Sequence, residues 1–247
     1  MTSDEKKILA GKVALVTGGS RGIGRAIAEA YALAGAAVFI CGRDENKVTA
    51  AVEAIRHAGG DIDGTCGDIG NFGDVERIIS AALRRFGTIH VLVNNGGILG
   101  PRETIADYPP DAWDEVLRIN LTGLFLMTRA VLPVMMEQRS GSIINVSSGV
   151  GRRGRARWGA YAVSKGGLES FTQVLADEVT QAGIRVNSVN PAATRTTMRA
   201  QAYPAEDPLT LLAPEEIVPV FLYLASDASA GVSGQALEAR DWLKKSD

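Results

Sequence analysis

The sequence is poor in cysteine and histidine, the residues that cross-link small secreted proteins and bind zinc. Its 247 residues include 2 Cys, Cys41 and Cys66, and 2 His, His57 and His90. Two cysteines cannot form the disulfide framework of a small secreted domain, and these scattered residues have no zinc-binding spacing. We therefore expect a protein of the reducing cytoplasm, without a metal site.

The sequence also lacks a long apolar run and a large excess of either charge. No apolar run approaches the ~18–20 residues of a membrane helix, and the amino-terminal MTSDEKK is charged, unlike a signal peptide. With 26 Lys and Arg against 28 Asp and Glu, no general attraction to nucleic acid is expected. We predict neither a membrane nor a nucleic-acid partner, so any anionic ligand must be recognised locally.

Short apolar runs rich in β-branched residues alternate with stretches of helical period along the whole chain. We predict strands at 13–17, 37–41, 62–66, 89–93, 142–147, 184–189 and 235–238. Helices are predicted at 22–34, 45–58, 72–86, 111–138, 158–181 and 214–225, with Asn71 and Asp111 as amino-terminal caps. This alternation predicts an α/β fold: one domain over residues 1–247, with a doubly wound, Rossmann-type parallel sheet of about seven strands and helices on both faces.

One tract interrupts the alternation. Residues 191–213 carry three prolines and have no strong periodicity. Loops of this length within a domain are usually functional, so we predict a substrate lid over 191–213.

The first predicted strand runs directly into a glycine-rich turn, TGGSRGIG at 17–24, within which a helix begins. Gly18, Gly22 and Gly24 would permit a tight turn and the close approach of a diphosphate. The free N–H groups of the following helix offer a partial positive charge. The alternative is a purely structural turn, but the context between strand and helix favours a dinucleotide site.

The spacing TGxxxGxG, followed by further motifs in order, resembles that of the short-chain dehydrogenase/reductase family, in particular the 3-oxoacyl carrier-protein reductase-like group, but with a shorter substrate lid. The resemblance covers residues 10–235. It rests on the turn, the NNGG sequence at 94–97, Asn120, Ser148, Tyr161-x-x-x-Lys165, and Pro191 followed by Thr196. It implies an NAD(P)-dependent oxidoreductase that acts on CH–OH groups.

The tip of the second strand bears on the choice of cofactor. An acidic residue there would bind the ribose hydroxyls of NAD, whereas an arginine suits the 2′-phosphate of NADP. The resemblance places Gly42 at the tip position of NAD users, followed by Arg43, and it places Arg21 beside the 2′-phosphate. We therefore favour NADP(H), with NAD(H) as the alternative. If Arg43 instead pairs with Asp44 or Glu45 in solvent, Asp44 becomes a rival ribose ligand.

The resemblance also implies the remaining cofactor contacts. They are Gly18, Ser20, Arg21, Gly22, Ile23 and Gly24 of the turn, Arg43, Asp68 and Ile69 on the adenosine side, Asn95 and Gly96 at the ribose, and Tyr161, Lys165, Pro191, Thr194 and Thr196 toward the nicotinamide. Two positions depart from the family pattern. Gly96 replaces an alanine, which predicts slightly looser packing beside the ribose. Ala192 replaces a glycine, and its methyl group is expected to approach the nicotinamide.

Tyr161 and Lys165 lie four residues apart in a predicted helix, so both project from one face. A phenol has a pKa of ~10, and a neighbouring ammonium and an oxidised nicotinamide both favour the phenolate. We therefore expect the Tyr161 pKa to be lowered. Tyr161 would give a proton to a carbonyl oxygen in reduction and take it back in oxidation.

Two further catalytic residues follow from the resemblance. Ser148, preferred to Ser147 because it lies thirteen residues before Tyr161, is implied to hydrogen-bond the substrate oxygen. Asn120 is implied to help hold a water that connects Lys165 to solvent. The alternative for Asn120 is that it satisfies an exposed backbone group.

The surroundings of the substrate are less specific. The cluster Arg152, Arg153, Arg155 and Arg157 is either a solvated loop, an ion-pair patch at an interface, or a dock for an acidic substrate or carrier. The resemblance places Ile98, Leu99, Val150 and Met198 in an apolar pocket. Trp158 either stacks on a substrate or packs the start of its helix.

These observations predict an NADP(H)-dependent oxidoreductase that transfers a hydride between nicotinamide and a small-molecule carbonyl or secondary alcohol, as a homodimer or homotetramer. Three alternatives stay open. They are a non-catalytic NADP-binding redox sensor, which should lack Tyr161 or Lys165; an NAD-preferring 3-oxoacyl or sugar dehydrogenase; and a sugar-nucleotide epimerase or dehydratase of the same superfamily.

Overall fold

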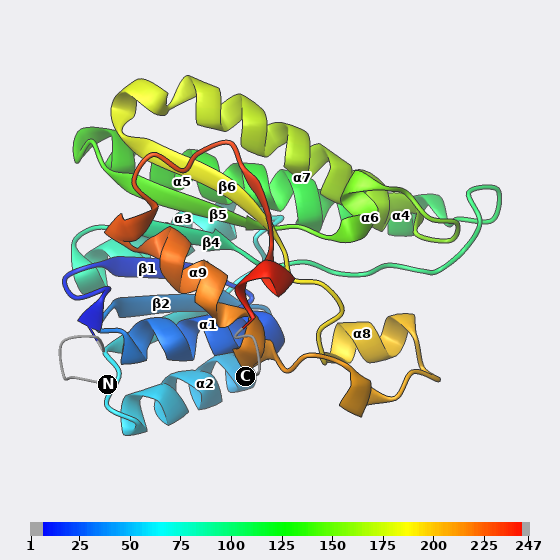
Figure 1. The fold of residues 1–247 in the computed structure, drawn as a ribbon, viewed down its shortest axis with the longest axis horizontal. Coiled ribbons are helices and arrows are strands. Elements are labelled where there is room, and N and C mark those ends of the chain that lie inside the picture. Colours follow the sequence, from blue (N-terminus) through cyan, green and yellow to red (C-terminus); the bar gives the residue numbers. More distant parts are fainter. Residues whose placement is uncertain (1–6, 244–247) are drawn as a thin grey trace.

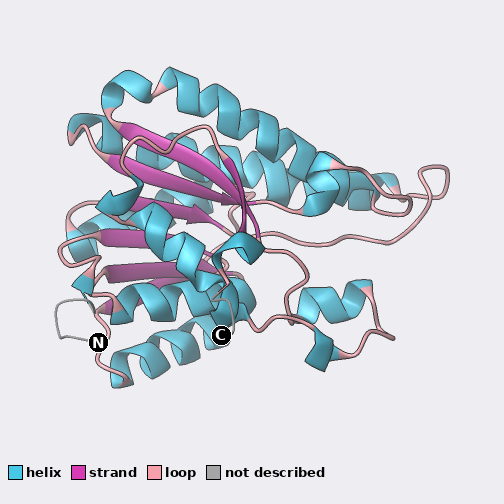
Figure 2. Cartoon of the chain, viewed as in Figure 1, coloured by secondary structure: helices cyan, strands magenta, loops and turns pink. Residues whose placement is uncertain are grey.

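Seven parallel strands form one sheet with helices on both faces in the computed structural model, which describes residues 7–243 (Figure 1, Figure 2). The strands are β1 Val13–Thr17, β2 Ala37–Gly42, β3 Ile62–Cys66, β4 Val91–Asn94, β5 Gly141–Val146, β6 Ile184–Asn190 and β7 Ala236–Glu238. Their order in the sheet is β3-β2-β1-β4-β5-β6-β7. The predicted α/β fold and each of its strands are confirmed, with small shifts at the strand ends.

The helices follow the strands as a doubly wound sheet requires. They are α1 Gly22–Leu33, α2 Glu45–His57, α3 Phe72–Phe86, α4 Pro110–Leu117, α5 Gly123–Glu137, α6 Gly149–Arg152, α7 Gly159–Glu178, α8 Thr197–Ala202 and α9 Val218–Ala225. A π-helical turn, η2 Arg118–Thr122, joins α4 to α5. Short 3₁₀ turns are η3 Thr180–Ala182, η4 Pro208–Thr210, η5 Pro214–Ile217, η6 Asp227–Ser229 and η7 Ala239–Trp242.

The sheet is buried on both faces because successive side chains of a strand point to opposite sides. In β1, Val16 packs into the core formed with α1, α2 and α9, whereas Leu15 packs into the core formed with α3, α5 and α7. Both side chains are fully buried. The near-continuous apolar strands of the sequence are explained by this two-sided burial.

The order in which successive strands are added reverses at β1, which lies between β2 and β4. At such a switch point the loops after the two central strands diverge and leave a crevice at the carboxyl edge. The glycine-rich turn follows β1, and Asn94 ends β4. The Asn94 amide donates to Asn145 Oδ1 of β5 over 3.0 Å and so ties these neighbouring strands together.

Two local predictions are wrong. Pro109, not Asp111, is the amino-terminal cap of α4, because Pro110 suits the first helical position and Asp111 falls within the first turn. The tract 191–213 is not wholly irregular, since it contains α8. Thr196 caps this helix by accepting from the Arg199 N–H at 3.1 Å. Six residues are too few to give a helical period in the sequence.

The stretch from α4 to α5 has an unexpected composition. Within residues 7–243, Pro110–Glu137 is long and apolar enough to cross a membrane by length and composition alone, and 44% of its most apolar 18 residues are buried in the fold. The expectation from the sequence concerned uninterrupted apolar runs, and Arg118 and Arg129 interrupt this stretch. Ile119, Met127 and Val131 of this stretch lie in the core with α3 and α7, and this packing accounts for part of its apolar character.

Candidate active site

A cleft of ≈ 560 Å³ follows the carboxyl edge of the sheet. The predicted cofactor residues that line it are Gly18, Ser20, Arg21, Gly22, Ile23, Arg43, Asp68, Ile69, Asn95, Gly96, Tyr161, Lys165, Pro191 and Thr196. Gly24, Asn120, Ser148 and Thr194 do not line the cleft. One end of the cleft, called here the outer end, carries Arg43, and the other, the inner end, carries Tyr161 and Lys165.

The glycine turn at the middle of the cleft has the geometry of an anion cradle. Gly18 and Gly22 have φ angles of +64° and +54°, which favour glycine. A Cβ on Gly24 would lie 2.3 Å from the Gly18 carbonyl oxygen, so the turn could not close with a larger residue. The side chain of Arg21, at the amino-terminal cap of α1, makes no capping hydrogen bond among the described residues, whereas Asp44 caps α2 and Asn71 caps α3. The first N–H groups of α1 therefore remain available to a diphosphate.

The outer end of the cleft carries charged side chains near solvent. The Asp44 carboxylate accepts from the Lys47 N–H at 3.1 Å and pairs with Lys47 Nζ at 2.5 Å. These contacts lower the Asp44 pKa. Within residues 7–243, Arg43 forms no salt bridge, so the alternative pairing of Arg43 with Asp44 or Glu45 is not observed. Arg43 and Arg21 both face the cleft, as a 2′-phosphate site requires.

The adenosine wall corrects one prediction. Gly96 does not loosen the packing, because a Cβ there would lie 2.8 Å from Ile69 Cδ1, and this methyl group already fills the space. Asp68 is held by a 2.7 Å bond from Arg118 and a 2.9 Å bond from the Gly70 N–H. The Asn95 amide donates to the Thr17 carbonyl over 2.9 Å, which binds the β4 loop to the glycine turn.

At the inner end, Tyr161 and Lys165 project from one face of α7 into the cleft. Lys165 is 5% exposed, and its Nζ donates to the Val146 carbonyl over 2.6 Å and lies 5.7 Å from the centroid of the Tyr161 ring. Burial lowers the Lys165 pKa to about 8, and the charge of Glu169 opposes this shift. The lysine therefore changes charge close to neutral pH.

The expected lowering of the Tyr161 pKa is not produced by the protein groups. Burial raises the Tyr161 pKa to about 12, and a hydrogen bond from Ser148 opposes this rise without reversing it. In the protein alone, desolvation of the phenolate outweighs its stabilisation by neighbouring groups, and the predicted lowering by an oxidised nicotinamide stays a prediction. Stabilisation of a phenolate here requires a further positive charge in the cleft.

Ser148 and Asn120 adjoin the inner end without lining the cleft. Ser148 Oγ accepts from the Val150 N–H at the start of α6, and Ser148 lies near enough to Tyr161 to act on the pKa of its hydroxyl. Asn120 is 2% exposed within the π-helical turn. Its Oδ1 accepts from the Ile98 N–H at 2.8 Å, and its Nδ2 donates to the Ile98 carbonyl at 2.9 Å and to Ser164 at 3.2 Å. The alternative role of satisfying a backbone segment is thus observed, and the role in a water relay stays a prediction.

The loop after β6 forms the last wall. Ala192 has a φ of +60°, a left-handed conformation that disfavours residues with a Cβ, so the replacement of glycine strains the backbone here. Thr194 is buried, and its hydroxyl donates to the Pro191 carbonyl at 2.8 Å. Thr196 lines the cleft while it caps α8.

This constellation is shared with a known family. A family model for short chain dehydrogenases matches residues 12–207. The chain belongs to the short chain dehydrogenase family. It is accordingly an NAD(P)-dependent oxidoreductase, and the resemblance seen in the sequence is confirmed.

Three similar proteins illustrate the range of this family. The oxidoreductase YciK of Escherichia coli K12 is 38% identical over 248 residues, covering 97% of this chain and 96% of YciK. The 3-oxoacyl-[acyl-carrier-protein] reductase FabG of Thermotoga maritima is 35% identical over 238 residues, covering 93% and 96%. A short chain dehydrogenase of Escherichia coli CFT073, solved with NADPH, has a TM-score of 0.91 at 37% identity and covers 95% of this chain and 99% of that one.

Beside Tyr161, this short chain dehydrogenase has an apolar cluster that faces α8. Leu99, Val150, Trp158 and Ala202 form its buried part, with Met198 and Tyr203 packed against them. The Trp158 ring lies 5.5 Å from that of Tyr161 and 6.1 Å from that of Tyr203. Trp158 therefore joins α8 to the start of α7. Ile98 lines the cleft and belongs to neighbouring clusters.

The arginine cluster is divided between two environments. Arg152 bonds Glu169 at 3.1 Å and pairs with Glu238, so it belongs to an ion-pair network. Arg157 pairs with Glu103 at 3.4 Å, and Arg153 and Arg155 are exposed. Arg152 and Arg157 thus form ion pairs within the chain, and a role of the cluster at an interface or as a dock stays a prediction.

Some cleft residues were not predicted from the sequence. Lys47 lies one turn into α2 from Asp44, and Thr197 follows Thr196. A helical projection from Asp44 would have pointed to Lys47, since residues three apart share a face. No pattern signalled Ser147, whose partner Glu169 is 22 residues away.

Proposed function

We propose that this chain is an NADP(H)-dependent oxidoreductase that transfers a hydride between nicotinamide C4 and a small-molecule carbonyl or secondary alcohol. One observation carries the proposal. Tyr161 and Lys165 line the inner end of a cleft whose middle is an uncapped helix start and whose outer end carries Arg43. An extended dinucleotide bound along this cleft would bring its nicotinamide to the tyrosine.

The cofactor would supply the hydride, and side chains of the protein would donate and accept the proton. In reduction, the hydroxyls of Ser148 and Tyr161 hydrogen-bond the carbonyl oxygen, and Tyr161 transfers its proton to that oxygen as the hydride reaches the carbon. The Lys165 ammonium stabilises the resulting phenolate and is the route for its reprotonation. In oxidation, Tyr161 takes the proton from the alcohol.

The preference for NADP(H) rests on charge at the outer end. Asp44, the rival ligand for the ribose hydroxyls, is already engaged by Lys47 and by the start of α2, whereas Arg43 and Arg21 face the cleft. A short chain dehydrogenase of Escherichia coli CFT073 is known as a complex with NADPH, which supports the same choice. Tighter binding of NADH than of NADPH would reject it.

The substrate carbonyl is a ketone, and the related 3-oxoacyl reductase suggests an acyl ketone among the first to test. A panel of ketones with NADPH should identify substrates that the parent reduces. Tyr161→Phe should lower kcat/KM by roughly 10²–10⁴-fold, because general acid catalysis is lost. Its affinity for NADPH should stay within about twofold of the parent, since only the hydroxyl is removed.

A matched control is Tyr223→Phe, because Tyr223 stacks on Trp242 away from the cleft. This variant should keep the parental rate. Parental turnover by Tyr161→Phe would contradict the proton-donor role, and NADPH binding without turnover on any ketone would favour the redox sensor. A cytoplasmic location, the lid role of 191–213 and a homodimer or homotetramer stay predictions.

A further inference from the structure

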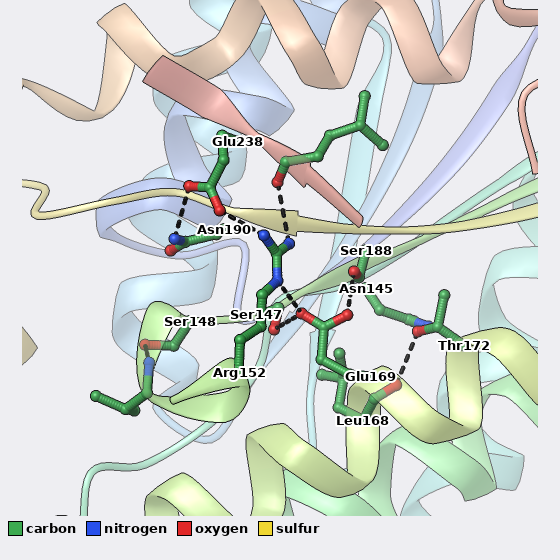
Figure 3. A network of polar contacts seen from close by, with 12 residues as sticks. Asn145, Ser147, Ser148, Arg152, Leu168, Glu169, Thr172, Ser188, Asn190 and Glu238 are labelled. Carbon is green, nitrogen blue, oxygen red and sulfur yellow. Dashed lines mark hydrogen bonds and ion pairs between the residues drawn. The ribbon is translucent and has the colours of Figure 1, made fainter. Parts of the chain in front are cut away.

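Glu169 lies on α7 one turn after Lys165, with its side chain 12% exposed. Its carboxylate accepts hydrogen bonds from Ser147 at 2.5 Å, from Ser188 at 2.5 Å and from Arg152 Nε at 3.1 Å (Figure 3). These donors come from the end of β5, from β6 and from α6. A nearly buried carboxylate with three donors from three elements is a strong structural junction.

Arg152 extends this junction to the carboxyl-terminal strand. Its guanidinium also pairs with Glu238 of β7, and the other oxygen of Glu238 accepts from Asn190 Nδ2 at 2.8 Å (Figure 3). Asn190 Oδ1 accepts in turn from the Ala192 N–H at 3.1 Å. We call the set Ser147, Arg152, Glu169, Ser188, Asn190 and Glu238 the Glu169 network.

The Glu169 network reaches the inner end of the cleft at three places, next to Ser148, on α7 and next to Pro191. Ser147 immediately precedes Ser148, and Arg152 ends the helix that Ser148 caps, so the chain is held on both sides of Ser148. Glu169 itself is on α7, the helix of Tyr161 and Lys165. Asn190 immediately precedes Pro191, which lines the cleft.

We propose that Glu169 is a positioning residue which, through Ser147 and Arg152, holds Ser148 and the loop after β6 in register with Tyr161 and Lys165. The inference rests on the proposed function, because it concerns the geometry of that reaction. A displacement of about 1 Å between reacting groups can cost on the order of 10²-fold in rate. Reacting groups therefore need supporting residues that are themselves locked.

The charge of Glu169 also acts on Lys165. The charged or titratable groups around Lys165 are Tyr161 and Glu169 on its own helix, Arg152 of α6 behind Glu169, and Glu238 of β7 behind Arg152. β5 presents the Val146 carbonyl to Lys165 Nζ, and β6 contributes the uncharged Ser188 to the bonds of Glu169. Glu169 raises the Lys165 pKa against the effect of burial. Loss of its charge should therefore let the lysine lose its proton at lower pH.

Glu169→Gln tests both effects in the full-length chain with NADPH and a ketone that the parent reduces. We expect kcat to fall roughly 10–100-fold, KM and the Kd for NADPH to stay within about twofold, and the alkaline limb of the kcat profile to move to lower pH. Asp227→Asn is the matched control, since Asp227 pairs with Lys12 at 2.9 Å outside the cleft and the network. It should leave kcat and its pH profile unchanged.

A second variant separates position from stability. Arg152→Gln should also lower kcat, and the double variant should be no slower than the slower single variant, because both residues act through one network. An unchanged kcat and pH profile in Glu169→Gln, or a double variant whose losses multiply, would overturn the inference. A lower melting temperature with unchanged kcat would assign the network to stability alone and overturn it too.

Failure of the proposed function has a different signature. If the parent reduces no ketone, the proposed reaction fails, yet the effect on Lys165 remains measurable without turnover. Denaturant unfolding between pH 6 and pH 10 should show the lysine-dependent rise in stability beginning at lower pH in Glu169→Gln than in the parent. Superimposable profiles would overturn the inference independently of activity.

Discussion

The two ends of the cleft differ in how far their polar side chains are exposed to solvent. At the inner end, Lys165 is 5% exposed and Asn120 is 2% exposed, and the polar side chains of both are bonded to the protein. At the outer end, the side chains of Lys47 and Asp44 are 56% and 44% exposed. Buried polar groups need fixed partners, whereas exposed charges are solvated and adjustable.

The difference indicates a division of labour within one cleft. Burial at the inner end moves both pKa values, that of Lys165 down to about 8, toward the neutral range in which proton transfer is efficient, and that of Tyr161 up to about 12, so that Tyr161 keeps its proton until a further positive charge enters the cleft. Recognition of a phosphate needs only accessible cations, so it is suited to a solvent-exposed rim. Three measurements would test how far this division extends.

The largest expected effect concerns Lys165 and folding. Its pKa is about 8 in the folded protein against an ordinary 10.5, so between pH 8 and 10.5 the unfolded chain binds the proton more strongly at this site. The free energy of unfolding therefore rises with pH across that window. Below pH 8, Lys165 is protonated in both the folded and the unfolded state, so the gain is not present there. Relative to Lys165→Met, the parent should gain about 3 kcal/mol of unfolding free energy between pH 7 and 10.5. If denaturant titrations gave the parent and Lys165→Met the same pH dependence of unfolding free energy, the lowered pKa of the buried Lys165 would be contradicted.

A smaller effect is expected at the outer end. Arg43→Ala should weaken NADPH binding roughly tenfold at low salt, because a charge-assisted contact with the 2′-phosphate is lost. The difference should be much smaller at high salt, because salt screens this exposed contact in the parent as well. NADH binding and the melting temperature should change little. Nicotinamide fluorescence titrations measure both cofactors, with Arg84→Ala on the exposed end of α3 as control. Equal loss for NADH and NADPH would remove the 2′-phosphate assignment.

The smallest effect concerns backbone strain at the inner end. Ala192 is in the left-handed region with φ +60°, so Ala192→Gly should raise the unfolding free energy by about 1 kcal/mol. The same change at Ala213, whose φ is −70°, should lower it by ~0.5–1 kcal/mol. Denaturant unfolding of both variants measures the difference. A stability loss at Ala192 would show that its methyl group contributes packing that outweighs the strain.

Much of the fold was predictable because its signals are local. Apolar β-branched runs indicated each strand, and Asn71 marked the start of α3 correctly. The short helices α6 and α8 were missed, since four and six residues carry no readable period. The cap of α4 was predicted at Asp111 because Asp is a favourable capping residue. The helix begins earlier, because Pro110 suits its first position.

The candidate site was predictable where a motif carries the chemistry within a few residues. Tyr161 and Lys165 share a helix face, and Gly18 and Gly22 share a turn. The direction of the Tyr161 pKa was not predictable, because it depends on how much protein surrounds the hydroxyl. Gly96 likewise gave the wrong expectation, since Ile69 fills the space from another loop.

By itself, the sequence determined the alternation of strands and helices, the family and the identities of the reacting groups, because each depends on neighbouring residues. Tertiary structure alone decided which carboxylate supports them. Glu169 meets Ser147 across 22 residues and Ser188 across 19, and Arg152 meets Glu238 across 86. Such contacts have no local signature, because they form only when the parallel sheet brings the carboxyl ends of β5, β6 and β7 to one edge.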